Sequence, residues 1–127
     1  MKSTGTNIAE FNNDVTFLAA VIEDAKEWIR DNTDKDISSS LISDRSGYTR
    51  WYFQRKFREF TGFKITYFVK LVRIQRAIPD IRDSQRTFTE IAELYGFNST
   101  LSLSRAVKEI YEMTPTELRD YCRRNRG

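Results

Sequence analysis

The sequence contains no histidine and only one cysteine, Cys122, which excludes several kinds of functional site. Without histidine no Ser-His-Asp triad can form, and one thiol cannot complete the usual zinc ligand sets. One cysteine also forms no disulfide within the chain, which favours a reducing, cytoplasmic location. The carboxylates are scattered with no grouped acid, base and nucleophile. We therefore expect no enzyme, no metal site and no cofactor.

Turn-forming residues are scarce, because the 127 residues include five glycines and two prolines. All-β folds need frequent turns, so this scarcity favours an all-α fold. No apolar run reaches the length of a signal peptide or a transmembrane helix, and we expect no membrane association. Nine phenylalanines, six tyrosines and two tryptophans can fill a core. This composition suits one compact domain or two very small ones.

The formal net charge is only +3, but the charges are unevenly distributed. Acidic residues concentrate between Asp14 and Asp36, and basic residues between Arg50 and Arg76, where Glu59 is the one acid. Three more arginines lie in the last eight residues. This asymmetry indicates a positive face and an anionic partner. The alternative is an ordinary solvated helix surface.

Apolar residues recur at helical spacing in seven segments, which predicts seven helices forming two helix-turn-helix subdomains joined by a linking helix. Inward-facing residues of the first half are expected to include Phe17, Leu41 and Phe60. Pro79 lacks an N–H and clashes with the preceding turn, so the linking helix should kink or end near Ile78. The expected parts are a flexible N-terminal arm (1–13), a first subdomain (14–63), the linking helix (64–84), a second subdomain (85–122) and a basic tail (123–127).

Local signals also predict where several helices begin. Thr49 and Ser99 are expected as N-caps. Thr87 with Glu90, and Thr114 with Glu117, have the spacing of a capping box, in which each side chain binds the backbone N–H of the other residue.

The chain contains an internal repeat. Ile42, Ser43, Gly47 and Tyr48 match Ile91, Ala92, Gly96 and Phe97 at an offset of 49. Thr49, Phe53, Arg55 and Phe57 match Ser99, Leu103, Arg105 and Val107 at an offset of 50. Each copy predicts a short helix, a glycine turn and a longer helix, the outline of a helix-turn-helix motif whose second helix enters the major groove of DNA. A plain helical bundle with two helical hairpins is the alternative.

The second helix of the first motif carries Trp51, Gln54, Arg55 and Arg58 opposite its apolar stripe. Arginine binds guanine through two donors, glutamine pairs with adenine, and an aromatic ring packs on a thymine methyl group. We therefore predict that Trp51, Gln54 and Arg55 contact bases. Alternatively, Trp51 lies at the edge of the core.

The corresponding helix of the second motif presents Leu101, Ser102 and Arg105, which are also predicted to contact bases. Arg105 is the one strong base-binding donor in this set, so the second motif should discriminate less stringently. The alternative assigns Leu101 to the core or to a protein contact.

Phosphate contacts are expected from a larger set of polar and basic side chains. Thr49 and Ser99 lie at helix N-termini, which attract phosphate. The full predicted set is Thr49, Arg50, Arg58, Lys64, Arg73, Ser99, Thr100 and Lys108, with Lys56 and Lys70 as further candidates. Such contacts supply affinity and salt dependence rather than specificity. The alternative for each basic residue is a simple surface charge.

From about Asp24 to Arg119, the chain resembles the DNA-binding domain of the AraC/XylS family of bacterial transcription regulators. The resemblance rests on Ser46-Gly47-Tyr48-Thr49-Arg50-Trp51-Tyr52-Phe53-Gln54-Arg55, on Tyr95-Gly96-Phe97-Asn98-Ser99 and on Thr114-Pro115. The Trp-x-x-Gln-Arg segment is most similar to the stand-alone subgroup of MarA, SoxS and Rob.

The resemblance implies a monomer that binds double-stranded promoter DNA through two recognition helices in successive major-groove segments. It also implies activation of stress and antibiotic-resistance genes by recruiting RNA polymerase, through the C-terminal domain of its α subunit. By position, Trp51, Gln54 and Arg55 fall on the subgroup's base-contacting places, and Arg105 on the main one of the second motif. No companion effector domain fits in the first 14 residues. We therefore expect no small-molecule ligand and control by the amount of protein.

Three features depart from the subgroup's pattern. Thr100-Leu101-Ser102 replaces the usual Gln-Gln-Thr, Val107 replaces an aromatic residue, and Pro79 interrupts the linking helix. The promoter set and the spacing of the two DNA elements are therefore open. These departures also leave an alternative function, a helical protein-interaction adaptor that has lost specific DNA binding.

Overall fold

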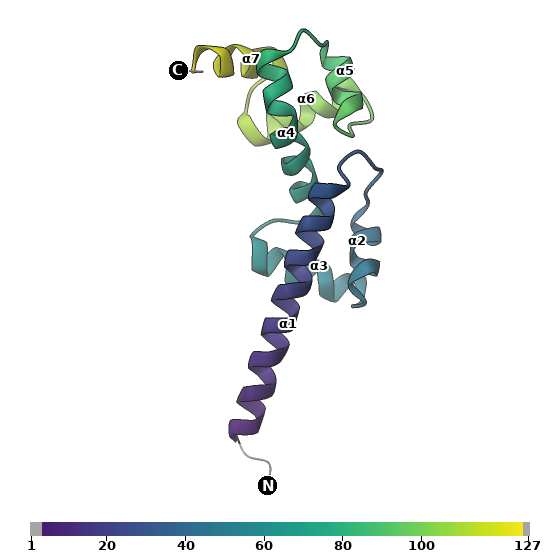
Figure 1. Cartoon of the computed structure of the whole chain (residues 1–127), viewed down its shortest axis with the longest axis vertical. Coiled ribbons are helices and arrows are strands. Elements are labelled where there is room, and N and C mark those ends of the chain that lie inside the picture. The colour runs from purple at the N-terminus through teal and green to yellow at the C-terminus, as the bar shows by residue number, and fades with distance from the viewer. Residues whose placement is uncertain (1–3, 126–127) are drawn as a thin grey trace. The chain divides into compact units, whose positions relative to one another are not determined.

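The computed structural model describes the backbone of residues 4–125 and the side chains of residues 14–125. Its helices are α1 (Thr4–Asp31), α2 (Ser39–Ser46), α3 (Arg50–Thr61), α4 (Ile65–Asp83), α5 (Phe88–Leu94), α6 (Thr100–Tyr111) and α7 (Pro115–Arg124) (Figure 1). The described residues include no strand, and the predicted all-α fold of seven helices is confirmed. Within this range no helix is long and apolar enough to span a bilayer.

The chain divides into two compact units. The first contains the chain up to Asp31 together with Ser38–Ile65, and so holds α1, α2 and α3. The second contains Asn32–Ile37 and the chain from Thr66 onward, which includes α4 after its first residue, Ile65, together with α5, α6 and α7. The expected division treated α4 as a separate linker and placed residues 32–37 in the first half. In the structure, both belong to the second unit.

In the first unit, α1 packs against α2 and α3 (Figure 1). Its buried stripe advances three or four residues at a time, which keeps it on one side of the helix. The stripe consists of Leu18, Ile22, Ala25 and Ile29, and the other buried residues of this unit include Ile42, Phe53 and Phe57.

Three residues predicted to face inward are exposed instead. Phe17, Leu41 and Phe60 are 62 %, 42 % and 42 % exposed. For two of them the residue one position later, Leu18 or Ile42, takes the core position. Adjacent residues differ by about 100° around a helix, so here Leu18 and Ile42 face the core while Phe17 and Leu41 lie on the flank of the apolar stripe.

The two ends of the chain are more helical than expected. The residues predicted as a flexible arm are helical from Thr4 onward, while residues 1–3 lie outside the described part. Residues 6–13 contain neither glycine nor proline, so nothing local interrupts the helix. At the other end α7 extends through Arg124, which removes two arginines from the expected tail. Residues 126 and 127 lie outside the described part.

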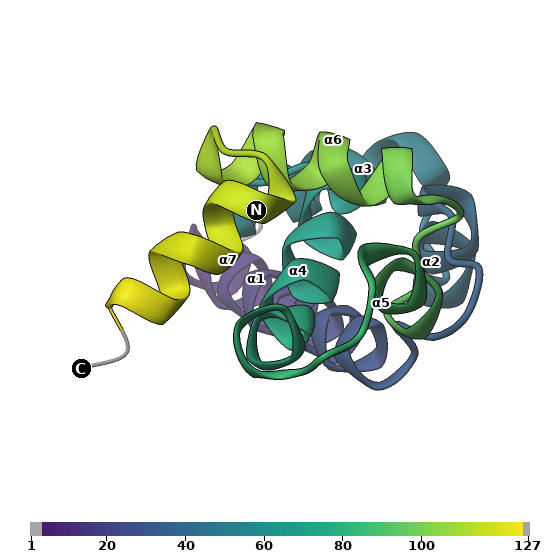
Figure 2. The ribbon, with the colours of Figure 1, turned by 90° about the horizontal axis from the view of Figure 1, so that it is seen from above.

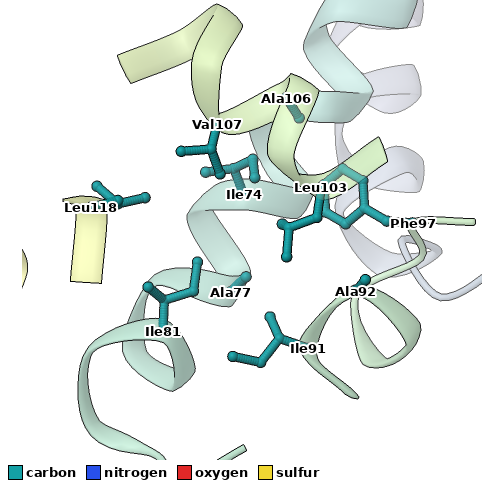
Figure 3. Packing of buried hydrophobic residues seen from close by; sticks show 10 residues of the cluster. All are labelled: Ile74, Ala77, Ile81, Ile91, Ala92, Phe97, Leu103, Ala106, Val107 and Leu118. Carbon is teal, nitrogen blue, oxygen red and sulfur yellow. The ribbon is translucent and has the colours of Figure 1, made fainter. Parts of the chain in front are cut away.

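The second unit is built around α4. Figure 2 shows α5, α6 and α7 arranged around this helix. All four helices contribute to one cluster of buried side chains, drawn in Figure 3: Ile74, Ala77, Ile81, Ile91, Ala92, Phe97, Leu103, Ala106, Val107 and Leu118. Val107, one of the departures from the subgroup's pattern, is therefore a core residue.

Two capping boxes predicted from the sequence begin α5 and α7. The hydroxyls of Thr87 and Thr114 accept hydrogen bonds from the backbone N–H of Glu90 and Glu117, whose carboxylates accept from the threonine N–H groups. The hydrogen bonds from Thr114 hold the pKa of the Glu117 carboxyl below its usual range.

The sequence predicted that α4 would kink or end near Ile78. The helix does not end there but continues through Pro79 to Asp83. Pro79 is exposed, whereas Ala77 and Ile81 on either side are fully buried. Packing of these neighbours therefore outweighs the lost backbone hydrogen bond. Arginines of α7 satisfy carbonyls of the last turn, since Arg119 Nε donates to Ile81 O at 2.7 Å and Arg123 Nε to Arg82 O at 2.8 Å.

Candidate nucleic-acid interface

Each unit holds one helix-turn-helix motif, made of α2 and α3 in the first unit and α5 and α6 in the second. The small residues Ser43 and Ala92, which match each other in the repeat, are buried and allow the two helices of each motif to approach closely. Gly47 and Gly96 occupy the turns with φ of +82° and +87°. Glycine enters this left-handed region without the steric cost of a Cβ.

The surroundings of the two turn glycines differ. A Cβ on Gly47 would meet nothing within 4 Å. A Cβ on Gly96 would collide with the carbonyl oxygen of Thr33 and lie 2.7 Å from Arg73 Nε. The turn of the second motif is therefore packed against the loop of residues 32–37, within the same unit.

Both longer helices, here called the recognition helices α3 and α6, begin at a hydroxyl cap. Thr49 Oγ1 accepts from Tyr52 N at 3.3 Å, and Ser99 Oγ accepts from Ser102 N at 3.1 Å. These hydroxyls satisfy one N–H at each helix start. The other first-turn N–H groups have no partner within the helix, and this is the property that lets a helix N-terminus receive a phosphate.

The outer face of α3 carries the three side chains predicted to contact bases in the first motif. Trp51 is 69 % exposed, so its ring does not lie at the edge of the core. Arg55 is exposed and Gln54 half-buried on the same side. The guanidinium of Arg55 lies 4.4 Å from the centroid of the Trp51 ring. This cation–π contact orients a long side chain that would otherwise lose much conformational freedom on binding.

The outer face of α6 repeats this arrangement. Leu101 is 57 % exposed, which places it outside the core, and Arg105 is exposed one turn later. Ser102 is half-buried, and its hydroxyl accepts from Ser99 Oγ at 3.2 Å. A hollow of about 400 Å³ opens beside this face, and Ser102 and Arg105 contribute to its lining.

Residues of the predicted phosphate-binding set occupy different environments. Arg58, Lys64 and Lys108 are exposed. Thr100 is half-buried and shares a hydrogen bond of 2.8 Å with the hydroxyl of Thr89.

Arg50 is exposed but engaged with an acid of α2. Its Nε and Nη2 donate to Asp44 at 3.0 and 2.9 Å. These hydrogen bonds hold the pKa of the Asp44 carboxyl below its usual range. A phosphate contact by Arg50 would have to compete with this paired arrangement.

The structure places Arg73 in a structural role rather than on the open surface. Its Nε donates to Thr33 O at 3.2 Å and its Nη2 to Lys35 O at 2.6 Å, which anchors the loop of residues 32–37 to α4. Burial lowers the pKa of this guanidinium. A side chain committed to two backbone carbonyls is poorly placed to bind a phosphate.

Sequence reasoning gave no role to two acids of this surface. Glu59 lies on α3 beside Lys56 and Arg55, and Glu109 lies on α6 beside Lys70. The repeat offset of 50 relates these two acids as it relates Arg55 to Arg105. Extending the alignment of the two copies by two residues beyond Phe57 and Val107 would have found the pair.

Comparisons with known proteins agree with this geometry. A sequence model of the family described as "Helix-turn-helix domain" matches residues 42–121. The TetD protein of transposon Tn10 from Escherichia coli is 34 % identical over 125 residues, which cover 98 % of this chain and 88 % of TetD. The multiple antibiotic resistance protein MarA of Escherichia coli is 30 % identical over 101 residues, 80 % of each chain.

The fold has solved counterparts. The structure of an AraC-type transcriptional regulator from Chromobacterium violaceum superimposes with a TM-score of 0.74 at 21 % identity, covering 86 % of this chain and 96 % of that one. From its family match and its relatives, the chain belongs to the AraC family of helix-turn-helix regulators and is a DNA-binding transcription regulator rather than an enzyme.

Proposed function

We propose that this regulator is an activator that binds promoter DNA as a monomer, with α3 and α6 in successive major-groove segments. It recruits RNA polymerase by contacting the C-terminal domain of the polymerase α subunit. The observation that carries the DNA-binding part of this proposal is the pattern shared by the two outer faces. On each face an exposed apolar side chain, Trp51 or Leu101, precedes an exposed arginine, Arg55 or Arg105, by one turn.

This pattern suits base recognition. A guanidinium donates to O6 and N7 of one guanine, and an apolar group packs on the methyl of a neighbouring thymine. The first motif adds Gln54, which can bind adenine, whereas the second has the shorter Ser104 at the matching position of the repeat. The first motif therefore discriminates more strongly.

Sequence-independent affinity comes from contacts to the DNA backbone. Arg58, Lys64 and Lys108 are exposed, and their positive charges contribute contacts to phosphates that are the same on any duplex.

The similarity to MarA, a multiple antibiotic resistance protein, supports a proposal about the target genes. We propose that the promoters bound by this regulator include those of stress and antibiotic-resistance genes, and that it acts in the cytoplasm, where bacterial promoter DNA is found.

The test is selection of the tightest duplexes from a random pool, followed by fluorescence anisotropy with the recovered sequence. We expect a consensus of two short elements about one helical turn apart. Arg55→Ala should weaken binding to it by about 5- to 100-fold, the equivalent of one bidentate base contact, and relax the preference at one element. Arg105→Ala should do the same at the other. Arg76→Ala, which removes an exposed arginine from α4, is the matched control and should leave the consensus unchanged.

Three outcomes would contradict the proposal. Binding without any consensus would leave only an electrostatic attraction to phosphates. Tolerance of both Arg55→Ala and Arg105→Ala would favour the protein-interaction adaptor. Transcription from the selected site that is equally strong when the polymerase lacks the C-terminal domain of both α subunits would remove the proposed route of activation.

A further inference from the structure

An acidic side chain occupies the same position on both recognition helices. Glu59 follows Arg55 by four residues on α3, and Glu109 follows Arg105 by four residues on α6. Residues four apart lie on successive turns of one helix face. Each recognition helix therefore carries a column of an exposed apolar residue, an arginine and a glutamate.

On α3 the glutamate is engaged with two cations. Glu59 Oε1 lies 3.1 Å from Lys56 Nζ, and Glu59 Oε2 lies 3.9 Å from Arg55 Nε. No other acid occurs between Arg50 and Arg76. The carboxylate thus competes with phosphates for two basic side chains of this recognition helix.

On α6 the glutamate has a different partner. Glu109 Oε2 accepts a hydrogen bond from Lys70 Nζ of α4 at 3.3 Å. Lys70, Arg105 and Glu109 all line the hollow beside the outer face of α6. In both motifs, then, the carboxylate that lies one turn after the arginine of the outer face forms an ion pair with a lysine.

Helix stability does not account for this repetition. Glu59 and Glu109 are about half exposed, and the Lys56 side chain is 26 % exposed. Ion pairs this accessible to solvent contribute little to the free energy of unfolding. Near a DNA backbone, in contrast, a carboxylate is repelled by phosphates and occupies cations that would otherwise bind them.

We propose that Glu59 and Glu109 are specificity-determining residues that act by weakening non-specific binding, an inference that rests on the proposed DNA-binding function. On a random duplex, Lys56 and Lys70 gain only phosphate contacts and must leave their carboxylates to do so. At the correct site, Arg55 and Arg105 gain bidentate contacts to bases, and these contacts offset any loss of the ion pairs made by the carboxylates. Lys56 can remain paired with Glu59 there.

The experiment compares the wild type with Glu59→Gln, Glu109→Gln and the double variant on two duplexes, the selected site and a scrambled sequence of equal composition. Anisotropy is measured over a series of salt concentrations. Each single variant should bind the scrambled duplex about three- to tenfold more tightly, with a salt slope steeper by about 0.9 for the released lysine. Affinity for the selected site should change by less than about twofold, so the ratio of the two affinities falls.

Glu23→Gln is the matched control, because it removes the same charge from an exposed pair with Lys26 on α1. It should leave the affinity ratio unchanged. Adding Lys56→Gln to Glu59→Gln should cancel the gain on the scrambled duplex. Circular dichroism and urea unfolding establish that each variant remains folded.

Equal tightening on both duplexes by Glu59→Gln and Glu23→Gln would reduce the effect to net charge and overturn the inference. Weaker binding of Glu59→Gln to the selected site alone would also overturn it, since the carboxylate would then be accepting from a cytosine amino group. A wild type that shows no preference between the duplexes would instead refute the proposed function itself.

Discussion

Gly96, the turn glycine of the second motif, has far less room around it than Gly47. Its positive φ and the closeness of Thr33 O and Arg73 Nε act together, whereas Gly47 combines a similar φ with open space. The two glycines occupy equivalent places in the repeat. Replacing each by alanine therefore distinguishes the free-energy cost of backbone strain, which both share, from the cost of a steric collision, which only Gly96 has.

Gly96→Ala should lower the free energy of unfolding by at least about 3 kcal/mol, because strain in the left-handed region is added to a clash with backbone. Gly47→Ala should cost only about 1 kcal/mol. Urea unfolding followed by circular dichroism measures both. An equal decrease in the free energy of unfolding for the two variants would show that the loop of residues 32–37 moves aside to accept the new methyl group without an energetic penalty.

Single residues also show how far the sequence predicts the site. Trp51, Arg55 and Arg105 were placed on outer faces correctly, because helical periodicity alone determines which side a residue takes. The inward bonds of Arg73 could not be predicted. They join residues about 40 positions apart, and no local pattern records such a contact.

Among the elements, α4 combines a proline with a helix that continues past it. Pro79 is exposed and adds no buried side chain to the core. Its effect on the free energy of unfolding is therefore mainly the missing N–H and the crowding of the preceding turn.

Pro79→Ala should raise the free energy of unfolding by about 1–3 kcal/mol, because it restores a backbone hydrogen bond within α4. Pro115→Ala is the contrasting control. Pro115 is buried at the start of α7, where proline is favoured, so its replacement should not stabilise the protein. Thermal and urea unfolding provide the comparison. An unchanged stability for Pro79→Ala would mean that the helix already accommodates the proline without strain.

Helix starts were the best predicted feature of the elements. Thr49, Thr87, Ser99 and Thr114 each cap a helix as expected, because capping is decided within four residues. The sequence left open whether α4 would kink or end near Ile78, since its continuation to Asp83 depends on tertiary packing around Ala77 and Ile81.

At the scale of the whole molecule, the expected phosphate contacts are distributed over both units. Arg58 and Lys64 lie in the first and Lys108 in the second, all exposed. Arg73 also belongs to the predicted set, but its donors are bonded to carbonyls within the second unit.

Arg58→Gln, Lys64→Gln and Lys108→Gln should each reduce the slope of log affinity against log salt by about 0.9 and leave the preferred sequence unchanged. Arg73→Gln should leave this slope unchanged and lower the free energy of unfolding instead, because Thr33 O and Lys35 O lose their donors. Anisotropy titrations and urea unfolding measure the two effects. A shallower salt slope for Arg73→Gln would show instead that Arg73 contacts a DNA phosphate.

The loop of residues 32–37 has a consequence for how such a protein can be recombined. It lies between α1 and α2 in the chain, yet it packs with the second unit through Arg73 and Gly96. A chimera that joins the first half of one relative to the second half of another at α4 therefore separates this loop from the residues that it contacts. Successful exchanges should transfer residues 32–37 together with the second half. The segment that must be exchanged as a whole is therefore encoded by two separate stretches of the gene.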